Sequence, residues 1–314
     1  MKLSLVIPCL NEEENVSELA ERIQEAFSKN LKYEVIWVDD GSTDNTGEKF
    51  KEISKKYKEH KSIILMRGVG QSTALMAGFD QAQGEYIATM DGDIQNDPDE
   101  IPKMLEKIEK EKLDMVVGWR EKRWKGNPVR RIPSLIANFI IRKSFKGINI
   151  HDAGCPVKVC KSEIMKNLRL YGELHRFLTY VIGDMGARIG EVKIKHRERQ
   201  GGVSKYGLSR TFKVLIDIIN VKFLTMRKTT PIQLLGGVAL ILILLSVASF
   251  AWMIYLSIVH GIGMGNTPLP VIFTMFLLMG SMFLVIGLLG ELIVRAYFEG
   301  SNQKSYMIRE LVKK

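Results

Sequence analysis

The sequence predicts an α/β fold with a mainly parallel sheet, followed by an interfacial helix and two membrane-spanning helices. Short apolar runs alternate with amphipathic stretches between residues 3 and 118, polar clusters follow three of those runs, and two long uncharged segments lie towards the C-terminus. Alternation of strands and helices with short links is typical of a parallel sheet that helices cover on both faces. We therefore expect a ligand site at one edge of the sheet and a membrane anchor after it.

The individual elements follow from the spacing of apolar residues. Apolar runs bounded by turn residues predict strands at 3–8, 33–38, 62–66, 86–90, 114–118 and 190–195. Apolar residues at helical spacing predict helices at 12–27, 44–57, 71–82 and 98–111, another after Ser134 and another near Glu173. Asp97 can cap the helix at 98–111, Pro98 suits its first turn, and Glu100 completes a capping box.

Composition narrows the possible classes of function. The 314 residues carry a net charge of +10, which favours nucleic acid, an anionic membrane or phosphorylated ligands as partners. The three cysteines form no CxxC pair, which indicates a reduced cytosolic compartment rather than a disulfide framework. The first apolar run ends at Pro8 and is too short for a signal peptide.

A pair of carboxylates follows the apolar run at 86–90. One glycine separates Asp91 from Asp93, and Gln95 lies two residues further on. Two carboxylates at a strand end can converge on a hard divalent cation, which leaves its other positions to water and phosphate oxygens. We interpret this motif as a site for Mg²⁺ or Mn²⁺ that binds a nucleotide diphosphate. The alternative is an acidic surface turn.

Two more polar clusters are expected at the same edge, because they follow the first two strands. They are Pro8-Cys9-Leu10-Asn11-Glu12 and Asp39-Asp40-Gly41-Ser42. Ligands of open α/β sheets bind beyond the carboxyl ends of the strands. The adjacent carboxylates of Asp39 and Asp40 repel each other and require hydrogen-bond donors, which a nucleoside could supply. The three clusters together predict nucleotide binding, with a plain turn as the alternative for residues 39–42.

The middle of the chain is basic. Arg120, Arg131 and Ser134 lie in one stretch, and Arg199 and Lys205 lie in a second stretch that is rich in glycine. Positive side chains around glycines, next to a suspected phosphate site, predict a rim that binds anions, with a solvated charged face as the alternative. Mixed charge signs and few interleaved aromatic residues argue against a nucleic-acid groove.

Two long apolar segments predict a membrane anchor. Residues 231–259 and 267–290 contain no charged side chain, and each segment exceeds the roughly 20 residues that cross a bilayer. Lys and Arg are absent from the linker and present on both outer flanks, which predicts a multi-pass protein of the cell membrane with both termini cytoplasmic. The expected parts are a cytoplasmic domain (1–207), a juxtamembrane amphipathic helix (208–228), a two-helix transmembrane hairpin (229–298) and a cytoplasmic C-terminal tail (299–314). The alternative for the second part, in front of the hairpin, is a helix that packs on the domain.

A nucleotide and metal site beside a basic rim and a membrane hairpin indicates group transfer from a soluble donor to a lipid. The chain also resembles family 2 glycosyltransferases of the polyprenyl-phosphate type, a group similar to dolichol-phosphate mannose synthases and bacterial undecaprenyl-phosphate glucosyltransferases. The segments that carry the resemblance are 6–15, 39–44, 91–95, 199–206 and the two terminal spans. The first three mark the broad family, and the last two are more specific for a lipid-phosphate acceptor.

The resemblance implies a GT-A fold, a nucleotide-sugar donor and Mg²⁺ or Mn²⁺. It implies nucleotide-sugar binding by Pro8, Asn11, Glu12, Asp39, Asp40 and Asp91, and metal binding by Asp91, Asp93 and Gln95. It implies binding of the acceptor phosphate by Arg120, Arg131, Ser134, Arg199 and Lys205, with catalytic roles for Asp93, Arg120 and Arg131. Relatives often carry Asn where Gly68 follows Arg67, so the motif leaves the pose of the donor open.

The expected reaction moves a single sugar from a UDP- or GDP-linked donor to a polyprenyl phosphate, such as undecaprenyl phosphate, with inversion of the anomeric carbon. The product would be a lipid-linked sugar donor for cell-envelope glycosylation. An ionised phosphate oxygen needs no strong general base, and paired arginines can position it. The alternatives are a processive membrane polysaccharide synthase and a non-enzymatic, membrane-tethered nucleotide-binding scaffold.

The identity of the sugar stays open at this point, and so does the oligomeric state. Small residues in the second span permit helix–helix contact, including contact with a second copy of the chain. These residues are Gly280, Ser281 and Gly287.

Overall fold

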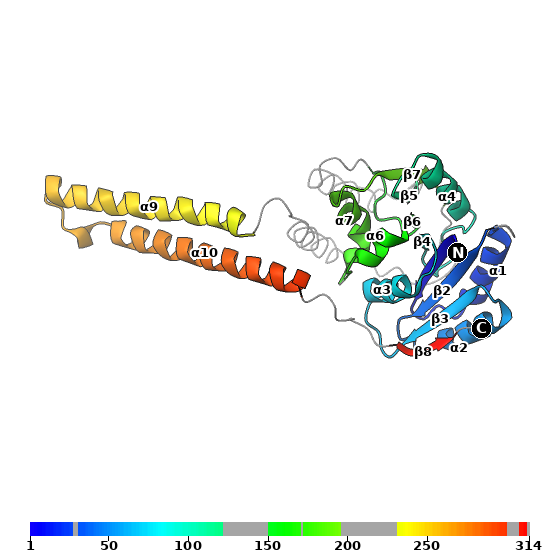
Figure 1. Cartoon of the computed structure of the whole chain (residues 1–314). Coiled ribbons are helices and arrows are strands. Elements are labelled where there is room, and N and C mark those ends of the chain that lie inside the picture. The colour runs from blue at the N-terminus through cyan, green and yellow to red at the C-terminus, as the bar shows by residue number, and fades with distance from the viewer. Residues whose placement is uncertain (28–30, 122–149, 171, 196–230, 300–307, 313–314) are drawn as a thin grey trace. The chain divides into compact units, whose positions relative to one another are not determined.

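The computed structural model describes residues 1–27, 31–121, 150–170, 172–195, 231–299 and 308–312 (Figure 1). The chain divides into two compact units. The first contains residues 1–221 and 304–314, and the second contains residues 222–303. The predicted juxtamembrane helix at 208–228 and the predicted helix after Ser134 lie outside the described residues. The predicted domain boundaries stay predictions.

An eight-stranded sheet is the centre of the described part of the first unit, in the order β7-β5-β6-β4-β1-β2-β3-β8 (Figure 1). Its strands are β1 (Leu3–Cys9), β2 (Tyr33–Asp39), β3 (His60–Leu65), β4 (Tyr86–Thr89), β5 (Met115–Trp119), β6 (Lys158–Lys161), β7 (Ile189–Lys193) and β8 (Ile308–Val312). The pairs β1–β2, β1–β4, β2–β3 and β5–β7 are parallel, and β6 and β8 pair antiparallel with their neighbours. The predicted mainly parallel sheet is confirmed.

Helices connect the strands and bury their apolar faces. They are α1 (Val16–Ala26), α2 (Thr46–Lys56), α3 (Gln71–Gln81), α4 (Glu100–Lys110), α6 (Ser162–Asn167), η1 (Leu174–Phe177) and α7 (Leu178–Asp184). In α1 the predicted face is buried through Val16, Leu19 and Ile23. Trp37 of β2 packs against Phe50 of α2 with ring centroids 5.3 Å apart, and both side chains are fully buried. Removal of this apolar surface from water stabilises the layered arrangement.

The helix after the acidic motif begins later than predicted. Glu100 is its first residue, and its N–H donates to the carbonyl oxygen of Asp97 at 3.2 Å across a turn that contains Pro98. The N-cap residue is Asp99, whose side chain makes no capping hydrogen bond. The Glu100 carboxylate instead pairs with Lys103 at 3.0 Å. Asp97 Oδ1 accepts a hydrogen bond from the Asp99 N–H at 3.5 Å, so Asp97 caps the turn before the helix as predicted, whereas Glu100 does not complete the predicted capping box.

The second unit is a helical hairpin of α9 (Pro231–His260) and α10 (Leu269–Glu299), joined through η2 (Met264–Asn266) (Figure 1). Two segments, Leu235–His260 and Leu269–Gly290, are long and apolar enough to cross a membrane. Gly280 allows close approach of the helices, because an added Cβ would lie 2.8 Å from Ile243 of α9. Ser246 Oγ also donates to the carbonyl oxygen of Phe273 at 3.1 Å. The contact permitted by Gly280 therefore forms within this chain.

Candidate active site at the carboxyl edge of the sheet

The described residues that were predicted to bind ligands lie along one edge of the sheet, where β1, β2, β4 and β5 end. Parallel pairing aligns these ends, because Cys9 pairs with Asp39 and Val6 pairs with Thr89. Backbone bonds extend the alignment beyond the strands: the Asp40 N–H donates to the carbonyl oxygen of Cys9 at 2.9 Å. The three separate motifs therefore lie together at the carboxyl ends of the strands, where open α/β sheets bind their ligands.

The loops after β1 and β2 are joined through Asn11. Its Oδ1 accepts a hydrogen bond from the Thr43 N–H at 2.8 Å, and its own N–H donates to Ser42 Oγ at 3.0 Å. Asn11 has φ 57°, a left-handed conformation that Asn tolerates better than most residues. The next residue, Glu12, donates its N–H to Thr46 Oγ1 at 2.9 Å. Together with the buried Pro8 of β1, these residues form a rigid corner.

The two adjacent carboxylates of this corner are satisfied by backbone donors. Asp39 Oδ1 accepts from the Ser42 N–H at 2.8 Å, and Asp40 accepts from the N–H groups of Val69 at 2.7 Å and Gly70 at 3.0 Å. Burial raises the pKa of Asp40, the two N–H groups lower it, and the nearby Asp39 raises it. Since these donors come from the chain itself, repulsion between the two carboxylates was the wrong reason to expect a nucleoside. The assignment of both residues to nucleotide-sugar binding stays a prediction.

The loop formed by residues 66–70 presses directly on the corner. Gly41 has φ +75°, and a Cβ at this position would lie 2.4 Å from the backbone nitrogen of Gly68. A side chain at residue 41 would therefore force the loop away from Asp40 and strain the backbone. The 66–70 loop and the end of β2 thus form one close-packed structure.

The acidic motif after β4 gathers negative charge. The Gln71 amide Nε2 donates to Asp91 Oδ1 at 2.9 Å, and the Gln95 N–H donates to Asp93 Oδ1 at 3.2 Å. Burial and then the proximity of Asp93 raise the pKa of Asp91 to about 6. The residue between the two carboxylates is Gly92. A side chain does not fit there, because a Cβ would lie 2.4 Å from Cys9 Sγ. The structure thus brings Asp91, Asp93 and the Gln95 backbone together beside β1.

The donor set of this motif suits a hard divalent cation. Mg²⁺ is commonly bound through one or two carboxylates and completes its shell with water and phosphate oxygens. Within the described ranges no three His, Cys, Asp or Glu residues cluster closely enough to enclose a metal by themselves. Burial is the main cause of the raised pKa of Asp91 and the nearby Asp93 is the second, and a bound cation would favour the charged form of both carboxylates. Asp91 and Asp93 therefore fit a cation that is shared with a phosphate ligand.

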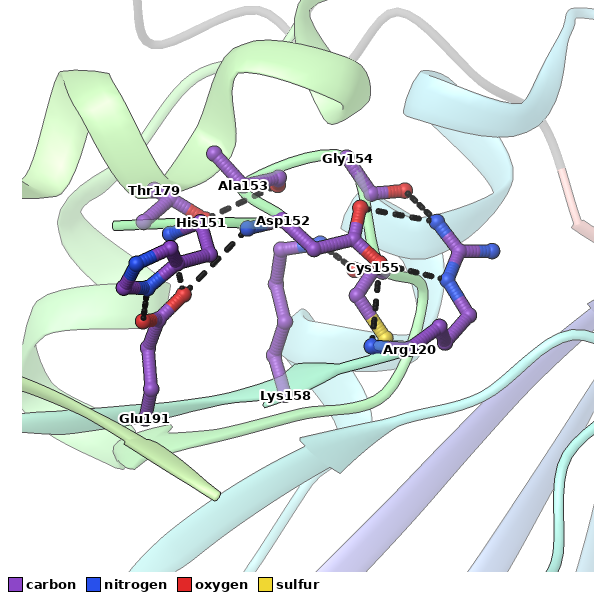
Figure 2. Close-up of polar contacts among 9 residues, drawn as sticks. All are labelled: Arg120, His151, Asp152, Ala153, Gly154, Cys155, Lys158, Thr179 and Glu191. Carbon is purple, nitrogen blue, oxygen red and sulfur yellow. Dashed lines mark hydrogen bonds and ion pairs between the residues drawn. The ribbon is translucent and has the colours of Figure 1, made fainter. Parts of the chain in front are cut away.

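Arg120 follows β5 and is held by a carboxylate (Figure 2). Its Nε donates to Asp152 Oδ2 at 2.7 Å, and its Nη2 donates to Asp152 Oδ1 at 3.0 Å and to the carbonyl oxygen of Gly154 at 3.1 Å. The Arg120 side chain is 5% exposed, so this forked ion pair is sheltered from water. The Arg120 charge also lowers the pKa of Asp91, which places positive charge close to the acidic motif.

The backbone that carries Asp152 is itself fixed by side chains (Figure 2). Glu191 Oε1 accepts from the Asp152 N–H at 3.2 Å, and Thr179 Oγ1 donates to the carbonyl oxygen of Ala153 at 3.2 Å. Lys158, at the start of β6, donates to the carbonyl oxygen of Cys155. Burial lowers the pKa of Lys158, and this cation also lowers the pKa of Asp91. The segment 151–155 is thus a rigid support for Arg120.

Sequence reasoning did not find three side chains that the structure places at this site: Gln71, Asp152 and Lys158. The sequence offered little signal for Asp152, since it lies in a short polar segment rich in small residues. Four other predicted residues of the acceptor rim lie outside the described residues. They are Arg131, Ser134, Arg199 and Lys205.

Comparison with known proteins places the chain in a family. Residues 4–169 match the family described as Glycosyl transferase family 2. The chain is 38% identical over 315 residues to a dodecaprenyl-phosphate galacturonate synthase from Rhizobium johnstonii, with 99% of this chain and 93% of the relative covered. It is 32% identical over 317 residues to an undecaprenyl-phosphate 4-deoxy-4-formamido-L-arabinose transferase from Shewanella sediminis, with 99% and 92% covered. The protein therefore belongs to glycosyltransferase family 2.

Solved structures agree on the fold. Glucosyl-3-phosphoglycerate synthase from Mycobacterium tuberculosis, crystallised with Mn²⁺, uridine-diphosphate-glucose and phosphoglyceric acid, superposes with a TM-score of 0.55 at 16% identity. The match covers 70% of this chain and 79% of the solved chain. The GT-A fold is confirmed, and so is the resemblance to polyprenyl-phosphate glycosyltransferases. The protein is a glycosyltransferase.

Proposed function

We propose that this enzyme transfers a single sugar from a nucleotide sugar to a polyprenyl phosphate at the cytoplasmic face of the membrane, with inversion of the anomeric carbon. One observation carries the proposal: the Asp91–Asp93 pair, with the raised pKa of Asp91, lies at the carboxyl edge of a GT-A sheet with cationic side chains nearby. Support for the acceptor comes from the names of relatives that match 99% of the chain.

On the donor side, Asp91, Asp93 and Gln95 would hold Mg²⁺ or Mn²⁺. Such a cation supplies a positive charge that stabilises the departing nucleotide diphosphate. Pro8, Asn11, Glu12 and Asp39 would line the nucleoside pocket. Asp40 contributes less directly, since it anchors the 66–70 loop through backbone N–H groups.

On the acceptor side, the attacking atom is a phosphate oxygen that is already ionised at neutral pH, so the enzyme needs no strong general base. Two anions must then approach each other closely, and positive charge has to offset their repulsion. Arg120 supplies such a charge near Asp91, in an orientation fixed by Asp152. Arg131, Ser134, Arg199 and Lys205 are the further residues proposed to bind the acceptor phosphate.

The membrane part of the proposal rests on the two apolar helices and on the charges that flank them. Lys and Arg surround the hairpin at its outer ends and are absent from its linker, an asymmetry typical of a hairpin that enters and leaves on the cytoplasmic side. This topology would put a soluble donor and the phosphate of an inner-leaflet lipid at the same face of the membrane.

Product analysis tests the proposed function. Purified full-length protein in detergent would be incubated with undecaprenyl phosphate, Mg²⁺ or Mn²⁺, and a panel of nucleotide sugars, and the lipid product would be weighed by mass spectrometry. The panel begins with UDP-linked galacturonate and 4-deoxy-4-formamido-L-arabinose, because these two sugars occur in the names of the relatives. UDP-glucose, UDP-GlcNAc, UDP-galactose and GDP-mannose complete it. We expect one sugar per lipid and loss of product after chelation; a polymer, or no lipid product with any donor, contradicts the proposal.

A further inference from the structure

The chain returns to the sheet after the hairpin and adds strand β8 to the free edge of β3. The pairing is antiparallel, with Ile63 opposite Leu311 and Ile64 opposite Glu310. The next pair joins Leu65 to Ile308, so the register shifts by one residue and Arg309 has no partner in the ladder. This arrangement is a β-bulge, and bulges commonly redirect a side chain next to functional sites.

The bulge directs Arg309 to the start of the 66–70 loop. Its Nη2 donates to the carbonyl oxygen of Met66 at 2.9 Å. The neighbouring Glu310 fastens the strand in a different direction, through an ion pair with Lys51 of α2 at 2.8 Å. Two adjacent residues of β8 thus have separable contacts, one with the loop and one with a helix.

The 66–70 loop leads from Arg309 to both carboxylate motifs. Its N–H groups at Val69 and Gly70 donate to Asp40, and the residue that follows, Gln71, donates to Asp91. The loop packs closely against Gly41 at the end of β2, where an added Cβ would lie 2.4 Å from the Gly68 nitrogen. A shift at Met66 would therefore change the distances at Asp40 and Asp91 together.

We propose that Arg309 is a positioning residue of the donor site, which holds the 66–70 loop against Asp40 from a strand that follows the membrane hairpin in the sequence. This inference rests on the proposed function, because it takes the Asp39–Asp40 and Asp91–Asp93 motifs as the place where the nucleotide sugar binds. Loss of the Arg309 contact leaves the sheet intact and loosens one end of the loop. The expected consequence is weaker binding of the donor with little change in binding of the lipid.

The test compares Arg309→Ala with the wild type in full-length protein. For Arg309→Ala we expect the KM of the nucleotide sugar to rise roughly fivefold, as for loss of one net hydrogen bond. The KM of undecaprenyl phosphate and the melting temperature should stay at the wild-type values. Hydrogen exchange of the Val69 and Gly70 amides should become faster, since their bonds to Asp40 would open more often.

Glu310→Ala is the matched control, because it breaks the ion pair with Lys51 and leaves Arg309 in place. Its donor KM and its exchange at residues 69 and 70 should match the wild type. Equal effects of the two variants, a parallel rise of both KM values in Arg309→Ala, or unchanged exchange in Arg309→Ala would each overturn the inference. Failure of the proposed function looks different: the wild type would then glycosylate no lipid, while the exchange measurement would still report on the loop.

Discussion

Glu34 and Asp91 are carboxylates at opposite edges of the same sheet, and their surroundings differ. Glu34, at the amino edge, accepts from Ser4 Oγ and from the Gln83 N–H, both at 2.6 Å, and forms an ion pair with Lys61 at 2.5 Å. Asp91, at the carboxyl edge, accepts one amide hydrogen bond from Gln71, and burial, followed by the proximity of Asp93, raises its pKa.

Asp114 repeats the pattern of the amino edge. It precedes β5 and binds Lys161 at 2.8 Å and Arg188 at 3.2 Å. The hydrogen bond from Arg188, followed by that from Lys161, holds the pKa of Asp114 well below its usual range. A carboxylate that the chain neutralises by itself stabilises the fold, whereas a carboxylate beside another carboxylate has charge left for a ligand.

The largest expected effect tests the carboxyl edge. Asp91→Asn should lower the rate of sugar transfer roughly 10²–10³-fold, because the cation loses a charged ligand and the leaving group loses its stabilisation. Its melting temperature should equal or exceed that of the wild type, since repulsion from Asp93 is removed. Enzyme kinetics and thermal unfolding in detergent would measure both quantities.

Asp99→Asn is the matched control for that variant. Asp99 is an exposed acid in the turn before α4, eight positions from Asp91 in the same segment. Its activity should stay within about twofold of the wild type, as for surface substitutions away from a site. Equal losses of activity at positions 91 and 99 would show that the acidic segment acts through its overall charge.

The next effect tests the amino edge, where a substitution should lower stability and leave catalysis unchanged. Glu34→Ala should lower the free energy of unfolding by about 3 kcal/mol, since it leaves Lys61 and the Gln83 N–H without their carboxylate. The folded fraction should keep wild-type kcat. Glu21→Ala, which breaks an exposed pair with Lys56, should leave the free energy of unfolding close to that of the wild type. A stable but inactive Glu34→Ala enzyme would contradict the assignment of a structural role to the amino edge and a catalytic role to the carboxyl edge.

A smaller effect concerns the pH dependence of stability, and it again arises at the amino edge. His60 begins β3, is fully buried, and accepts a hydrogen bond from Trp37 Nε1 at its Nδ1 at 3.0 Å. Burial lowers the pKa of His60 to about 4. The unfolded chain, whose His has a pKa near 6.5, therefore binds the proton first as pH falls.

Stability from neutral His60 should thus be complete above about pH 6.5 and lost progressively down to about pH 4, in total roughly 3 kcal/mol. Unfolding curves at several pH values would measure the loss. In His60→Asn the decline over this interval should be shallower. An identical decline in both proteins would assign the pH dependence to other groups.

Much of the fold was predictable because its signals are local. Apolar runs and helical spacing indicated the strands up to β5, the helices between them and strand β7. The position of ligand sites at the carboxyl ends of parallel strands brought Asp39 and Asp91 together. Strand β8 was not predicted, because its exposed charges Arg309 and Glu310 give no apolar run. The short strand β6 was missed for a related reason, since it consists of four residues with lysine at each end.

The acidic residues of the site could be predicted from the sequence, but most of the groups that pair with the site residues could not. Asp152 is 32 positions from Arg120 in the sequence, and no local pattern joins them. The donors to Asp40 are backbone N–H groups of Val69 and Gly70, which any residue type except proline could supply. Pairings of this kind arise from the packing of loops and carry no signature in the sequence.

The account depends most on a divalent cation held by the two carboxylates at the carboxyl edge, and binding of Mn²⁺ tests this directly. Electron paramagnetic resonance of the full-length protein with a saturating nucleotide would count bound ions. We predict one Mn²⁺ for the wild type and for Glu34→Ala, and none at the same concentration for the double variant Asp91→Asn with Asp93→Asn. Undiminished Mn²⁺ binding by the double variant would contradict the account.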